Sequence, residues 1–408
     1  MPIQRITPEA DERVKRRALL AVFITIFVSL IGFGIVIPLL PFYAQRFQAS
    51  ELQIGLLFAA FSVAQLFASP ILGDWSDRWG RRPVLILSLL GSAASFVMLA
   101  LAPNLLWLFL SRLLDGFTGG NITTARAYIA DISPPERRAR NFGLIGAAFG
   151  LGFILGPALG GGLASFGLAV PAWAAAAMSL LAAAYAFVAL PETAHLVPAK
   201  RPSPWREMPV TLTRSPAARL LWMNFILWLG FSIYQTTFPL FVAMRFGLGP
   251  REIGYILAVV GLVGALSQAA LVGRAVHALG EQRTLLVGLL LNIVGLSGAA
   301  FTHSLPVFYL LVGVASMGGA LALPCVVSLI SRSASDTEQG RIQGVSGSLE
   351  SLARIVAPIG GNGALKYSDA LPYAAAAGLL AFSVLLALSV RLPADTNCMG
   401  KIYENKRD

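Results

Sequence analysis

The stretch from Gly73 to Arg82 reads Gly-Asp-Trp-Ser-Asp-Arg-Trp-Gly-Arg-Arg and stands between two apolar runs, 52–72 and 84–102. Each run is about 20 residues long, the length that an α-helix needs to cross a bilayer. The charged segment between them therefore predicts a tight turn at a membrane face. Its glycines let two helix ends approach closely, and its carboxylate and guanidiniums can exchange partners between two packings of helices.

The composition of the whole chain indicates a multi-pass membrane protein. Of its 408 residues, 56% are hydrophobic and 12% are charged, whereas about 25% are charged in soluble domains. We predict an all-α fold of twelve transmembrane helices in two six-helix bundles. The apolar runs that predict them are 18–40, 52–72, 84–102, 105–129, 140–163, 170–190, 217–243, 252–272, 284–302, 305–330, 340–363 and 371–391.

The second half of the chain repeats the first. Arg46-Phe47 recurs as Arg245-Phe246, Ile54-Gly55 as Ile253-Gly254, and Pro157 as Pro358. A repeat with an even number of helices gives both halves the same orientation in the membrane. We therefore predict an N-terminal bundle over residues 1–190, a proline-containing cytoplasmic linker over 191–216, and a C-terminal bundle over 217–408.

The net charge of +11 does not indicate a nucleic-acid partner, because the basic residues sort by membrane side rather than forming one face. Most of them lie in alternate loops, counted from the N-terminus. The positive-inside rule then places both termini in the cytoplasm. We expect a monomer in the cytoplasmic (inner) membrane whose partners are lipid, protons and a small-molecule substrate.

The charged turn resembles the loop between helices 2 and 3 of the major facilitator superfamily. The matching residues are Gly73, Asp77, Arg78, Gly80, Arg81 and Arg82. The resemblance implies a conformational switch in which Asp77 faces the start of helix 11 and Arg81 meets Asp131, when the protein is open to the outside. In the second half the corresponding loop has lost this pattern. The alternative is a positively charged loop with no switching role.

The fifth apolar run resembles the helix 5 signature of drug:proton antiporters in that superfamily. The signature residues are Gly143, Gly152, Gly156, Pro157, Gly160 and Gly161. Small residues four apart let helices pack backbone to backbone in lipid. We expect Gly156 and Pro157 at the interface between the halves. The alternative is a generic close-packed helix pair.

The sequence from Trp75 to Gly91 and from Arg112 to Gly161 is similar to that of tetracycline-efflux transporters. Acidic residues inside helices 1, 3 and 9 of those relatives are replaced here by Ser29, Ser95 and Asn292. Only Asp115 and Glu350 lie deep in a predicted span, so both are candidates for proton coupling, with Asp115 preferred. Arg112 and Arg354 lie on the same helix faces, which leaves two structural ion pairs as the alternative.

Polar residues within the spans are candidates for a substrate cavity, although each could instead join helices. They are Arg112, Asn121, Tyr234, Gln235, Asn292 and Arg354. The two cysteines, Cys325 and Cys398, are too differently placed to pair, and no metal site is expected. No phosphate-binding loop is present, so we expect no cofactor and no enzymatic activity.

Together the resemblance implies a secondary transporter that exports a small, amphipathic compound in exchange for protons by rocking its two halves. Two alternatives stay open. One is a facilitator or importer of a polar metabolite, which the missing acids favour. The other is a membrane sensor that uses this fold without transport, which the retained switch loop argues against.

Overall fold

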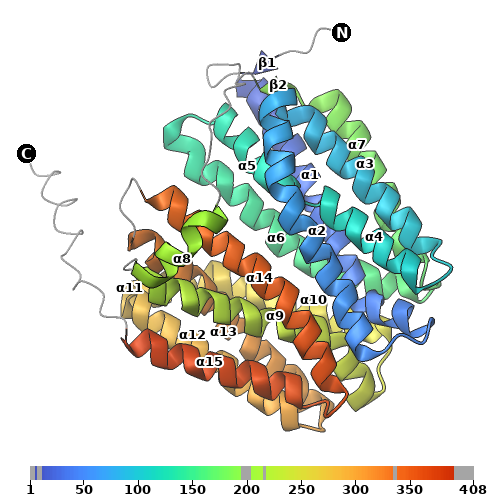
Figure 1. Cartoon of the computed structure of the whole chain (residues 1–408), viewed down its shortest axis with the longest axis vertical. Coiled ribbons are helices and arrows are strands. Elements are labelled where there is room, and N and C mark those ends of the chain that lie inside the picture. The colour runs from blue at the N-terminus through green and yellow to red at the C-terminus, as the bar shows by residue number, and fades with distance from the viewer. Residues whose placement is uncertain (1–4, 7–11, 194–203, 215–216, 334–337, 390–408) are drawn as a thin grey trace, which may run out of the picture.

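The computed structural model describes residues 5–6, 12–193, 204–214, 217–333 and 338–389, and nearly all of them are helical (Figure 1). The first bundle comprises α1 (Glu12–Gln45), α2 (Glu51–Trp79), α3 (Arg81–Ala100), α4 (Leu105–Thr118), α5 (Asn121–Ile132), α6 (Pro135–Ala164) and α7 (Val170–Ala189). The second comprises α9 (Ala218–Phe246), α10 (Pro250–Ala270), α11 (Val272–Leu279), α12 (Glu281–Phe301), α13 (Leu305–Arg332), α14 (Gln339–Leu365) and α15 (Leu371–Ser389). Two short strands, β1 (Arg5–Ile6) and β2 (Glu192–Thr193), pair in parallel.

Within the described residues, the twelve predicted apolar runs lie on helices, which confirms the all-α fold. Among the described residues, ten helices are long and apolar enough to cross a membrane. The runs 105–129 and 340–363 are not among these ten. The first is divided at Gly119 and Gly120 into α4 and α5, and Gln65 of α2 donates to the Gly119 carbonyl at 3.2 Å. The second carries charged residues along α14.

The predicted linker contains more structure than its prolines suggested. Helix α8 (Pro204–Arg214) lies within it, and Met208 and Leu212 pack against the core of the second bundle. Thr211 on the same helix is 1% exposed. Pro204 is tolerated because a first helical residue needs no internal N–H bond. Residues 194–203 and 215–216 of the linker, and Cys398, lie outside the described residues, while Cys325 is buried in α13.

The two halves meet through backbone contacts on the membrane face opposite the charged turn. In the α6–α10 pair, a Cβ placed on Gly161 would lie 2.8 Å from the Gly254 Cα, and one on Gly254 would overlap the Pro157 carbonyl. In the α2–α14 pair, a Cβ on Gly55 would overlap the Pro358 carbonyl. Any side chain at these glycines would force the halves apart on this face.

Toward the face that carries the charged turn, the same helices leave space. A Cβ on Gly143, Gly146 or Gly150 of α6 would meet nothing within 4 Å, and the same holds for Gly347 near the start of α14. Figure 1 shows the two bundles converging at one end and diverging toward the end that carries β1, β2 and α8. The halves are thus closed on one face and separated on the other.

One buried arginine fastens the closed face of the second bundle. Arg245 at the end of α9 donates from Nε to Asp369 Oδ2 at 2.6 Å, and from its terminal nitrogens to the carbonyls of Thr302 and Ala300 at 3.0 and 3.2 Å. The arginine therefore links three separate segments. Its hydrogen bond to Asp369, between α14 and α15, lowers the pKa of that carboxyl below its ordinary value.

We predict that Asp369→Asn destabilises the protein by about 1 kcal/mol near neutral pH, as expected for loss of a partly exposed charge-assisted bond. Because the pKa is lower in the folded state, the stabilisation is complete above the unfolded-state pKa and is lost as the pH falls through the folded value. Thermal unfolding in detergent at neutral and acidic pH measures this. A wild-type loss on acidification no larger than that of the variant would contradict it.

Candidate functional site

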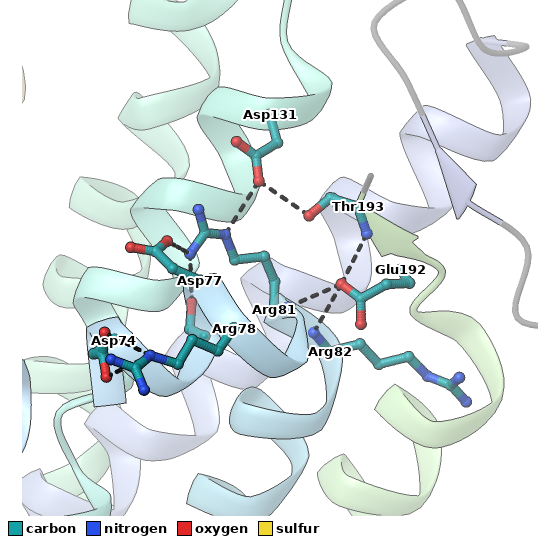
Figure 2. A network of polar contacts seen from close by, with 9 residues as sticks. Asp74, Asp77, Arg78, Arg81, Arg82, Asp131, Glu192 and Thr193 are labelled. Carbon is teal, nitrogen blue, oxygen red and sulfur yellow. Dashed lines mark hydrogen bonds and ion pairs between the residues drawn. The ribbon is translucent and has the colours of Figure 1, made fainter. Parts of the chain in front are cut away.

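The predicted switch residues form a compact charge cluster around Arg81, at the start of α3 (Figure 2). The Arg81 side chain forms an ion pair with Asp77 of α2, donates to Ser76 Oγ at 2.6 Å, and donates from Nε to Asp131 Oδ2 of α5 at 3.2 Å. Arg81 is 9% exposed. One guanidinium therefore joins α2, α3 and α5 within the first half.

Two further members of the cluster come from β2, which follows α7. Glu192 Oε1 accepts hydrogen bonds from the backbone N–H groups of Arg81 at 2.8 Å and Arg82 at 3.4 Å. Thr193 Oγ1 donates to Asp131 Oδ2 at 3.0 Å. Gly80, the residue before α3, has no side chain that could cap this helix, so Glu192 supplies the cap. The sequence around Glu192 does not predict that it caps α3, because its partners lie more than 100 residues away in the chain.

The remaining switch residues differ in their surroundings. Gly80 adopts φ = 105°, a conformation that favours glycine, whereas a Cβ on Gly73 would meet nothing within 4 Å. Arg78 pairs with Asp74 at 3.0 Å on the surface, and Arg82 donates to the Phe187 carbonyl. The predicted contact of Asp77 with the start of the eleventh span, which is α14 in the structure, concerns a conformation open to the other face. It stays a prediction.

The second half also has an ion pair at the corresponding place, with an acidic residue where the first half has Arg81. At the start of α12, Glu281 accepts from Ser328 at 2.7 Å and from Arg332 at 3.3 Å, both on α13. Glu281 and Arg332 occupy the places of Arg81 and Asp131 in the repeat. The loop was predicted to have decayed; its motif has changed, but an ion pair between equivalent helices is retained.

The helix 5 signature divides between two faces of α6. Cβ atoms on Gly152, Gly156 and Gly160 would clash with α1, at 2.7 Å from Leu30 Cβ, Gly34 Cα and Ile35 O respectively. Gly161 instead contacts α10 of the other half, and Pro157 lies against both, with its ring beside Gly34 of α1 and its carbonyl beside Gly254 of α10. The expectation that Gly156 lies between the halves is therefore wrong, because its face of α6 is covered by α1. Gly143 contacts neither helix.

The predicted pair of Arg112 and Asp115 is present and almost fully buried. Arg112 Nη1 and Asp115 Oδ2 are 2.7 Å apart, and their side chains are 3% and 6% exposed. The guanidinium lies 4.7 Å from the centre of the Phe61 ring on α2. Arg112 Nε has no hydrogen-bond partner among the described residues. An isolated charge at this depth is costly, so each residue stabilises the other.

Glu350 is not paired with Arg354, contrary to the interpretation that they form an ion pair. Instead, Glu350 Oε1 accepts from Asn224 Nδ2 of α9 at 3.2 Å. Arg354 lies 5.4 Å from the centre of the Trp228 ring. Asn224 and Trp228 are one helical turn apart on α9, and neither was singled out from the sequence. A single buried amide or tryptophan in a span gives no signal by itself.

The other cavity candidates do not gather at one place. Asn121 of α5 donates to Ser29 of α1 at 2.9 Å, Tyr234 packs against Phe238 and Tyr373, and Asn292 lies against Gly318 and Gly319 of α13. Gln235 is half-buried. Asn121, Tyr234 and Asn292 thus serve helix contacts within one half. Among the described residues, no group of three or more His, Cys, Asp or Glu side chains could hold a metal ion.

Comparisons with known proteins agree with this architecture. The family model described as Major Facilitator Superfamily matches residues 22–358 and 220–396. Tetracycline resistance protein, class C, of Escherichia coli is 34% identical, over 84% of this chain and 88% of that protein. Multidrug resistance protein 2 of Bacillus subtilis is 31% identical, over 82% and 85%. The crystal structure of the human organic anion transporter MFSD10 (TETRAN) aligns with a TM-score of 0.70 at 28% identity, covering 91% of this chain and 99% of that one.

We predict that Gly161→Leu separates the halves on their closed face, because the new side chain would meet Gly254 and Arg251 of α10. Spin labels at Gln48 and Ser304, in a background with both cysteines replaced by serine, report the distance between the halves. We expect a longer and broader distribution. Gly162→Leu is the matched control, since a Cβ there meets only the Tyr255 hydroxyl at 3.7 Å. Identical distributions for Gly161→Leu and wild type would contradict the assignment.

Proposed function

Because the chain belongs to the major facilitator superfamily, we propose that it exports small amphipathic, drug-like compounds across the cytoplasmic membrane in exchange for protons. The chain shares about a third of its residues with tetracycline and multidrug resistance proteins over most of its length. One structural observation carries the proposal furthest. The halves touch through glycine and proline backbone on one face and separate on the other, as a transporter that opens to alternate sides requires.

We assign the moving bodies to residues 1–190 and 217–408, joined by the linker 191–216. The face with the charged turn and the termini is cytoplasmic, so this conformation is open to the cytoplasm. Opening to the outside would separate Gly161 from Gly254 and bring the start of α14 toward α2. Asp77 would then leave Arg81 for the N-terminus of α14, whose partial positive charge favours an anion.

A coupling carboxylate must bind and release a proton in each cycle. In this conformation Asp115 accepts a hydrogen bond from the Arg112 guanidinium at 2.7 Å, so loss of the Asp115 charge would leave Arg112 buried without a counter-charge. Glu350 accepts from a neutral amide, so it can take up a proton without breaking an ion pair. We therefore propose Glu350 as the main candidate for the carboxylate that carries the coupled proton. The ion pair of Asp115 and Arg112 would break only when substrate binds or the conformation changes.

The substrate would lie between the halves, near the buried guanidiniums of Arg112 and Arg354 and the ring of Trp228. Each arginine has an Nε atom without a partner among the described residues, which suits a ligand with hydrogen-bond acceptors. An aromatic surface beside these donors suits a flat apolar part. A facilitator of small polar metabolites, the main alternative, needs no such apolar surface.

We predict that Asp77→Asn lowers transport at least about tenfold, which corresponds to a loss of about 1.4 kcal/mol in the switch interaction, while the protein still folds and inserts. Transport into inverted membrane vesicles measures this. Asp74→Asn is the control, because the one ion pair of Asp74 among the described residues is with exposed Arg78. This variant should transport normally. Normal transport by Asp77→Asn would refute the switch assignment.

We predict that Glu350→Gln abolishes pH-driven transport in proteoliposomes while substrate counterflow, which needs no net proton movement, continues. Asp115→Asn should impair both, because it leaves Arg112 without its partner. If transport by Glu350→Gln remains fully proton-driven and only Asp115→Asn loses the coupling, then Asp115 carries the proton and Glu350 does not. If neither variant loses coupling, the facilitator alternative replaces the antiporter.

A further inference from the structure

A pocket lies outside the switch and the buried charge clusters, between the first turns of α1 and the connection from α5 to α6. Its volume is about 430 Å³. The lining combines one carboxylate with several cations and a few apolar side chains. The lining residues are Glu12, Arg13, Lys15, Arg16, Leu19, Ile132, Pro134, Arg137, Arg140 and Asn141.

The pocket has an excess of positive charge that the protein only partly neutralises. Its one carboxylate, Glu12, pairs with Lys15 at 3.1 Å and with Arg137 at 3.1 Å. Arg16 and Arg140 have no hydrogen bond or ion pair among the described residues, and both are exposed. Like charges around one hollow repel one another, so an anion placed there would lower the energy of the arrangement.

The internal repeat provides a comparison for this charge. Arg140 at the start of α6 corresponds to Arg341 at the start of α14, and Arg341 pairs with Glu338 three residues earlier. The residue three positions before Arg140 is Arg137, so a like charge stands where the other half has its counter-ion. The requirement for basic residues on a cytoplasmic face does not by itself explain this difference, since both starts lie on that face.

The pocket lies where α1 passes from polar to apolar sequence. Leu19, Ile132 and Pro134 line it, and the next residue of α1, Leu20, is 49% exposed. Beyond Leu20, α1 is mostly apolar, and its residues are buried or half-buried as far as Ala44. A ligand here would have its charged group among the arginines and its apolar part beside Leu19 and Leu20.

We propose that this pocket binds the phosphate group of an anionic phospholipid from the leaflet at that face. Basic pockets between transmembrane helices on the cytoplasmic side bind such headgroups, and the proposal rests on the cytoplasmic placement of this face. The phosphate would lie between Arg16 of α1 and Arg140 of α6, the two lining cations that have no partner within the described part of the chain. It would join the ends of α1 and α6, which the Glu12–Arg137 pair already links.

The test is lipid retention by the purified full-length protein in native mass spectrometry, with phosphatidylglycerol and phosphatidylcholine of identical acyl chains. We expect preferential retention of phosphatidylglycerol. Arg16→Gln combined with Arg140→Gln should weaken this preference about 30-fold, corresponding to roughly 1 kcal/mol for each charge removed. No substrate or proton gradient is needed, so the result is independent of the transport proposal.

Arg274→Gln combined with Arg283→Gln is the matched control, because it removes two exposed arginines from the same face of the second half. The control should retain the lipid, and both double variants should show monodisperse profiles and unfolding temperatures close to wild type. Equal loss in both would indicate general surface charge and overturn the site. Stabilisation of the wild type by inorganic phosphate alone, equal to that by phosphatidylglycerol, would also overturn it in favour of a soluble ligand.

Discussion

Backbone contact between α6 and α10, with its counterpart between α2 and α14, is the constraint on which the arrangement of the halves depends. In a bilayer, lipid tails are as apolar as leucine side chains, so the hydrophobic effect does not drive helices together. Close packing must do so, and only small residues permit it. The backbones approach closely where Gly161 lies against Gly254 and where Gly55 lies against Pro358. Toward the other face the same helices leave space beside Gly143 and Gly347.

The charged residues follow a second constraint, which is that a charge within the membrane must have a partner. Arg112 and Asp115 satisfy one another within a single helix. Arg354 instead lies over Trp228, and Glu350 is held by an amide. The two halves therefore differ in how firmly their mid-membrane acids are bound, although the repeat gives them similar backbones. Asp115 thus has a charged partner on its own helix, whereas Glu350 accepts a hydrogen bond from a neutral side chain of another helix.

At the membrane face that carries the charged turn, an ion pair joins equivalent helices in each half, but the positive and negative residues are exchanged. Arg81 with Asp131 and Glu281 with Arg332 join equivalent helices with reversed polarity. Only the first half adds Glu192 as a cap on α3. Since β2 begins the segment that leads to the second bundle, this segment is in direct contact with the charge cluster around Arg81. A movement of the linker would disturb the cap of α3 directly.

The sequence by itself determined the all-α membrane fold and the family, because apolar length and glycine spacing are local properties that a bilayer enforces strongly. It did not show α8 or the division of 105–129 into α4 and α5. The family resemblance placed Asp77, Arg81 and Asp131 in one cluster, and the three side chains are in contact here, whereas their role in a conformational switch stays a prediction. Tertiary structure alone decided which side of α6 each glycine faces, since Gly156 lies against α1 whereas Gly161 lies against α10. The same holds for Glu350, which binds Asn224 of α9 rather than Arg354 on its own helix, and for Glu192, whose partners are distant in the chain. Helical spacing limits which side chains can meet within one helix, but partners from other helices depend on how the bundle packs.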